Sequence, residues 1–146
     1  LASLAGGESG GRLTAHAASG VTAAVLRCDA EGRGRVETLD GTTITTSMGV
    51  TQGGDAVISV SDATGTKAAL AATSHGGLLN IMSLRGIPIL VAGGNADAPG
   101  GAIAIINARG VPVITLQVDA TDGGKIVTTT AEGKRSKTLE PVRSSW

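Results

Sequence analysis

The sequence predicts an all-β protein of repeated β-hairpins, about 23 residues each, stacked as a β-solenoid, a β-prism or an intertwined fibre. Three observations predict it. Glycines recur at nearly constant spacing, short runs of alternating apolar and polar residues flank them, and helix is poorly supported along the chain. Glycine inside a helix costs about 1 kcal/mol relative to alanine, whereas Thr, Val and Ile favour strands.

Six glycines are the expected hinges of the hairpins. The gaps between them are 21, 24, 21, 24 and 23 residues, and a period in this range is typical of repeat architectures. Glycine adopts the positive φ that tight turns require. The expected hinges are Gly20, Gly41, Gly65, Gly86, Gly110 and Gly133. Small or turn-forming residues stand three positions before each hinge, which agrees with a turn there.

Apolar residues hold fixed places on either side of each hinge. Five residues before it, five of the six units have an apolar residue, and three residues after it an aliphatic residue recurs. Alternation of this kind indicates strands with one apolar face. The predicted core and assembly positions in the central units are Leu79, Ile81, Ile89, Ile103, Ile105 and Val113.

In chain order, we expect an N-terminal arm over residues 1–11, a six-hairpin β-repeat domain over 12–140 and a C-terminal tail over 141–146. The arm is either a linker or a strand that docks on a neighbour. The Ala-rich segment Lys67–Thr73 is the best helical candidate, but its register with the returning strands predicts a strand. Pro88 and Pro112 stand two residues past their hinges, where a residue without an N–H must lie at a bend or an unpaired position.

Charge and composition exclude several function classes. The chain has 12 basic and 12 acidic residues, so it lacks the basic surplus typical of nucleic-acid binding. No apolar run is long enough to predict a membrane span. The sequence has no Phe or Tyr and a single Trp, so its apolar groups fill thin layers rather than a thick core. Such layers need cover from stacked hairpins or from other chains.

No motif predicts catalysis or a cofactor. The glycine pairs precede expected strands rather than helices, which argues against a phosphate-binding loop. No G-x-S-x-G pattern marks a nucleophile, and we expect the protein not to be an enzyme. Calcium is an open alternative at Asn95, Asp97, Asp119 and Asp122, but these loops lack EF-hand spacing. We therefore expect no cofactor and no metal.

The repeated sequence pattern GGxLxVxNxxGxxV over Gly10–Leu139 resembles the Gly-rich β-repeat segments of bacterial extracellular filaments and phage tail fibres. This resemblance implies an extracellular location, or one at the cell or virion surface, and a structural role in self-assembly. We expect a subunit of a β-rich filament or trimeric fibre whose partner is itself, as a homotrimer or helical filament. The alternative is an adhesin, or a stalk module that binds a host-surface glycan or receptor through loops such as Gly93–Gly101.

Overall fold

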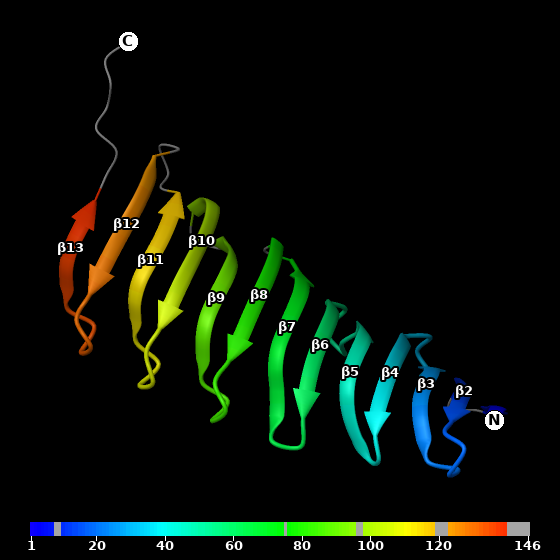
Figure 1. Cartoon of the computed structure of the whole chain (residues 1–146). Coiled ribbons are helices and arrows are strands. Elements are labelled where there is room, and N and C mark those ends of the chain that lie inside the picture. The colour runs from blue at the N-terminus through cyan, green and yellow to red at the C-terminus, as the bar shows by residue number, and fades with distance from the viewer. Residues whose placement is uncertain (8–9, 75, 96–97, 119–122, 140–146) are drawn as a thin grey trace. The chain divides into compact units, whose positions relative to one another are not determined.

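The described part of the chain is built entirely from β-strands (Figure 1). The computed structural model describes residues 1–7, 10–74, 76–95, 98–118 and 123–139. These residues contain thirteen strands and no helix. The predicted all-β class is therefore confirmed, and the strands are antiparallel. The expected tail, residues 141–146, lies outside the described residues.

The chain divides into two units, Leu1–Ala72 and Thr73–Trp146. In the first, each strand pairs antiparallel with the next along the chain. Its strands are β1 (Ala2–Gly7), β2 (Gly10–His16), β3 (Thr22–Cys28), β4 (Gly34–Asp40), β5 (Thr43–Val50), β6 (Ala56–Asp62) and β7 (Gly65–Thr73), the last ending at the boundary. The N-terminal arm thus forms β1, which pairs with β2 of its own chain. The Lys67–Thr73 segment lies in β7, a strand as predicted.

The second unit has the same meander topology. Its strands are β8 (Gly76–Met82), β9 (Pro88–Asn95), β10 (Ala98–Ile106), β11 (Pro112–Val118), β12 (Gly124–Thr129) and β13 (Arg135–Leu139). Among the described residues of each unit, strands contact only their neighbours in the sheet. The described strands of each unit therefore form a single layer of sheet.

Polar side chains close most of the turns. In the turn after β10, Gly110 N–H donates to the carbonyl of Asn107 at 2.9 Å, and Asn107 N–H donates to the carbonyl of Val111 at 2.9 Å. The Asn107 side chain also accepts from the N–H groups of Arg109 and Val111, at 2.9 and 3.1 Å. Ser83 and Thr130 hold the same place in their turns. These hydrogen bonds explain why short polar residues recur there.

A β-bulge follows the hinge in all six hairpins of the described chain. On the return strand of each hairpin the pairing skips one residue, while the outgoing strand continues without a break. The skipped residues are Ala23, Thr45, Lys67, Ile89, Val113 and Ser136. Pro88 and Pro112 begin β9 and β11 next to such a bulge, where a missing N–H is tolerated. Bulges increase twist, so the sheets of both units twist near the hinges.

Candidate functional site

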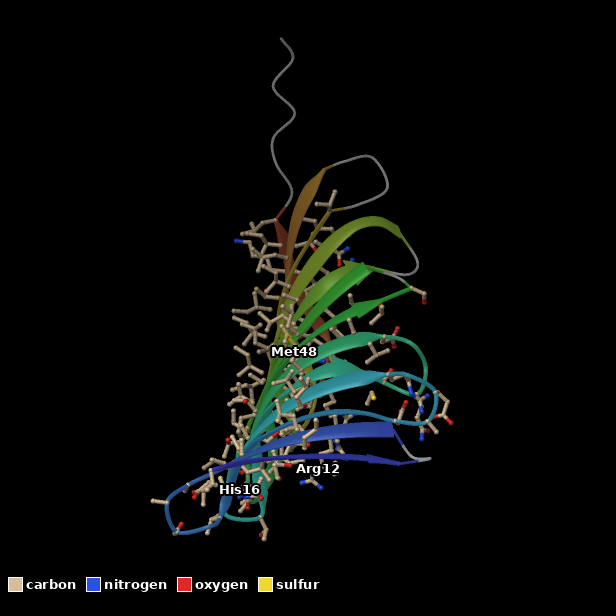
Figure 2. The ribbon with its side chains drawn as sticks, turned by 90° about the vertical axis from the view of Figure 1, so that its right-hand side faces the viewer. Arg12, His16 and Met48 are labelled. Carbon is tan, nitrogen blue, oxygen red and sulfur yellow. The ribbon has the colours of Figure 1, made fainter. Side chains whose placement is uncertain are left out.

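One face of the first unit carries an unbroken row of large aliphatic side chains. Directly paired residues of antiparallel strands lie on the same face, so the register defines the row. The row, here called the first ladder, is Leu4, Leu13, Leu26, Val36, Met48, Ile58 and Leu70. Figure 2 shows side chains projecting from both sides of the strands and labels Met48.

The second unit has an equivalent row, the second ladder, formed by Leu79, Ala92, Ile103, Leu116, Ile126 and Leu139. A neighbouring row on the same face pairs Ile81, Leu90, Ile105 and Ile114. Four of the six predicted core and assembly residues thus share one face: Leu79, Ile81, Ile103 and Ile105. The other two, Ile89 and Val113, are bulge residues skipped by the pairing.

The ladders are exposed in the single chain. First-ladder residues are between 41% and 82% accessible, and the large second-ladder residues are between 36% and 50% accessible. The most buried positions of the first unit lie on the opposite face, at Thr14, Val25 and Glu37. Folding of one chain therefore leaves its most apolar surface in contact with water. Such a surface in a native protein marks an interaction site.

The six predicted hinge glycines all have positive φ, between 62° and 121°. Five of them lie in the turns. Gly65 is the first residue of β7 and follows the two-residue turn Ala63–Thr64. The hinge glycines are structural positions at the ends of strands, and glycine has no side chain that could take part in chemistry.

Three arginines lie side by side on the face opposite the first ladder, which we call the polar face. Arg12 on β2 pairs directly with Arg27 on β3, which pairs with Arg35 on β4. Arg27 Nη2 lies 2.8 Å from Glu37 Oε1, and Arg35 Nη1 lies 3.6 Å from the same oxygen. Arg12 Nε donates to Thr14 Oγ1 at 3.1 Å. Figure 2 labels Arg12.

The turn beside this arginine cluster is closed by its own ion pairs. Arg33 Nε lies 2.7 Å from Asp29 Oδ2, and Arg33 Nη2 lies 2.8 Å from Glu31 Oε2. The hydrogen bond from the Arg33 side chain lowers the pKa of Asp29, and the same bond raises the pKa of Arg33. The Arg33 guanidinium is therefore paired with the two carboxylates of its own turn.

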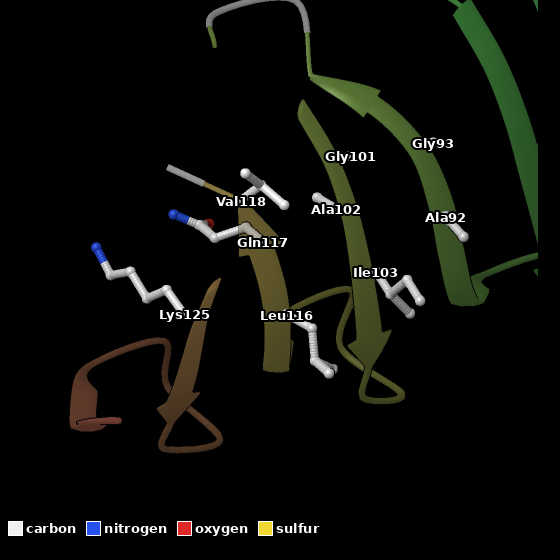
Figure 3. A pocket seen from close by; sticks show the side chains of 9 residues that line it. All are labelled: Ala92, Gly93, Gly101, Ala102, Ile103, Leu116, Gln117, Val118 and Lys125. Carbon is white, nitrogen blue, oxygen red and sulfur yellow. The ribbon is translucent and has the colours of Figure 1, made fainter. Parts of the chain in front are cut away.

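An open apolar depression of about 500 Å³ lies over strands β9 to β12 (Figure 3). Gly93 and Gly101 contribute no side chain to it, and Ala102 and Val118 line it. Lys125 is the one charged residue among those lining it. The depression therefore combines an apolar surface with a single amine, that of Lys125.

Sequence reasoning missed the arginine cluster. Its residues are spread over 24 positions, and only the cross-strand register brings them together. The positions of the turns could have indicated this cluster, because residues equally far from a hairpin turn lie opposite each other. Arg12 and Arg27 flank the Gly20 hinge at similar distances, and Arg27 and Arg35 flank the next turn. Of the calcium candidates, Asp97, Asp119 and Asp122 lie outside the described residues.

Among the described residues no group of His, Cys, Asp and Glu side chains is arranged to hold a metal ion. In the same part of the chain, no helix is long and apolar enough to cross a membrane. No protein-family model matches the chain, and no curated protein matches its sequence.

Proposed function

We propose that the protein is a structural subunit of a self-assembling extracellular β-rich filament or trimeric fibre. The observation that carries this proposal is the pair of exposed aliphatic ladders on single-layer sheets. A sheet with one apolar face needs a second layer to remove that face from water. Among the described residues neither unit supplies such a layer from its own strands, and a second copy of the same surface is the simplest cover.

Burial of the ladders supplies the driving force. Fully burying a large aliphatic side chain contributes about 1.5–3 kcal/mol, so covering the exposed half contributes about 1 kcal/mol for each. Association itself costs about 4–15 kcal/mol in lost freedom and ordering. One or two side chains cannot offset that cost. The seven members of the first ladder contribute about 7 kcal/mol, and two copies that face each other contribute about twice that, which is comparable to this cost.

The outer edge of the first unit offers a second contact. Strand β1 pairs with β2 on one side, and its sequence ASLAGG has no charge and no proline to prevent pairing on the other. Strand β13, by contrast, carries Arg135 and Lys137, which oppose edge pairing. Ladder packing alone suits a closed trimer, whereas growth into a filament needs β1 pairing together with ladder packing, because two β1 edges that pair with each other close a dimer.

The repeat itself supports a fibre. All six hairpins in the described chain combine a positive-φ glycine near the hinge with a bulge on the return strand. We propose that these units of about 23 residues stack as a solenoid, prism or intertwined fibre in the assembly. The extracellular location is proposed because the repeated sequence pattern resembles the repeat segments of bacterial and phage fibres.

Electron microscopy of the purified chain tests this function. We expect long filaments or short rods of uniform width at micromolar concentration. Dispersed particles of single-chain size under the same conditions would contradict the proposal and would favour a self-contained binding module.

A further inference from the structure

We propose that the arginine cluster of Arg12, Arg27 and Arg35 binds a tetrahedral oxyanion, the charged group of a phosphate or sulfate ligand. The site lies on the polar face, opposite the first ladder. It is independent of the proposed assembly, because covering the ladders leaves this face open.

The register places three guanidinium groups on adjacent strands at one level of the sheet. Side chains that are directly opposite have Cβ atoms about 4.5–5.5 Å apart, and like charges in that arrangement repel. Water and salt screen part of this repulsion because Arg27 and Arg35 are nearly half exposed, and a bound anion relieves what remains.

The chain supplies only part of the neutralisation. Glu37 is the one carboxylate in contact with the cluster among the described residues, and one of its oxygens serves both Arg27 and Arg35. Three positive charges and one negative charge leave a local excess of +2. The neighbouring turn, with Asp29, Glu31 and its own arginine, contributes −1, so the region as a whole stays at +1.

Arg12 is the arginine of the cluster whose guanidinium is available to bind a ligand. Its Nε is held by the buried hydroxyl of Thr14, and no ion pair involves its guanidinium in the described part of the chain. The two terminal nitrogens of Arg12 therefore keep their N–H donors available while the group is held in one orientation. A guanidinium fixed in this way suits bidentate binding of an oxyanion.

A hollow of about 420 Å³ accompanies these groups. It is lined mainly by polar surface and includes all three arginines, with Gly10 and Gly11 forming part of its wall. This volume lies within the range of about 300–1,000 Å³ found for small-ligand sites. A tetrahedral anion presents oxygens in several directions, which matches donors from three adjacent strands better than a flat carboxylate does.

Two probes test the site by isothermal titration calorimetry of the full chain at constant ionic strength and pH 7: inorganic phosphate and a sulfated disaccharide. We expect Arg12→Gln to weaken binding of the bound probe at least tenfold, because one charge-assisted contact is lost. Glu37→Gln should strengthen binding, because it removes the internal competitor. Arg85→Gln, with the same charge change in an exposed turn, should bind as the wild type does.

The two probes separate the sources of the oxyanion. Binding of phosphate alone assigns a phosphate ligand, and binding of the disaccharide alone assigns a sulfated glycan; either supports the site. Failure of both probes to bind, or equal weakening by Arg12→Gln and Arg85→Gln, overturns it. Circular dichroism checks that each variant folds. If Arg12→Gln does not fold, Arg12→Lys keeps the charge without the planar fork and should still weaken binding several-fold.

Discussion

Replacing Leu26 with Asp should prevent assembly while leaving the single chain folded. Leu26 lies in the first ladder between Leu13 on β2 and Val36 on β4. Its side chain is 50% accessible in the single chain, so a carboxylate at this position can remain hydrated there. In an assembly that covers the ladder, the same carboxylate loses its water.

The magnitude follows from that accessibility. Covering the exposed half of Leu26 contributes about 1 kcal/mol to assembly, and the substitution removes it. Burying an unpaired carboxylate, or protonating it, costs several kcal/mol more. The sum is at least about 4 kcal/mol per contact, which corresponds to roughly a thousandfold loss of affinity. A micromolar assembly would then dissociate completely at the same concentration.

Leu84→Asp is the matched control. Leu84 is 83% accessible in the turn between β8 and β9, so it undergoes the same chemical change outside both ladders. Sedimentation velocity at micromolar concentration should show single chains for Leu26→Asp and wild-type assemblies for Leu84→Asp, with equal circular dichroism. If Leu26→Asp assembled like the wild type, the ladder would not be the contact surface.

Three further predictions concern stability, measured by chemical or thermal unfolding. Arg27→Gln should destabilise the chain by about 1–2 kcal/mol, because buried Glu37 loses its nearer charged partner while Arg35 remains 3.6 Å away; unchanged stability would contradict the assigned ion pair. Gly93→Ala should destabilise by about 1–3 kcal/mol because its Cβ would lie 2.6 Å from a backbone oxygen, whereas Gly124→Ala meets no atom within 4 Å and should be tolerated. Asp29 has a pKa below its ordinary 3.8 because of the hydrogen bond from the arginine four residues later, so its stabilising effect is present above about pH 4 and is lost as the pH falls further. Asp29→Asn should therefore be less stable than wild type at pH 7, with the difference shrinking as the pH falls below 3.8, and a constant difference would refute this origin.

Local features of the chain were predictable from the sequence. The hinge glycines and the polar residues that close the turns act within five residues of one another, so their spacing alone indicates where strands end. Alternation likewise identified Leu79, Ile81, Ile103 and Ile105, which share one face. These are properties of neighbouring residues and need no knowledge of tertiary contacts.

Burial and cross-strand grouping were not predictable in the same way. Accessibility depends on whether a second layer covers the sheet, and nothing in a hairpin's own sequence specifies that layer. The bulges shift the register by one residue near each hinge, so Ile89 and Val113 are skipped although their spacing matches the apolar pattern. The pairing of Arg12 with Arg27 depends on the same shift.

The molar mass of the folded chain in solution tests the central claim most directly. Light scattering coupled to size-exclusion chromatography, at micromolar concentration, should give a mass of at least twice 14.3 kDa, or elution at the void volume. A mass above that of one chain is expected because a second copy must pack on the exposed ladders to remove them from water. A single folded species at 14.3 kDa that stays soluble for days would contradict the account.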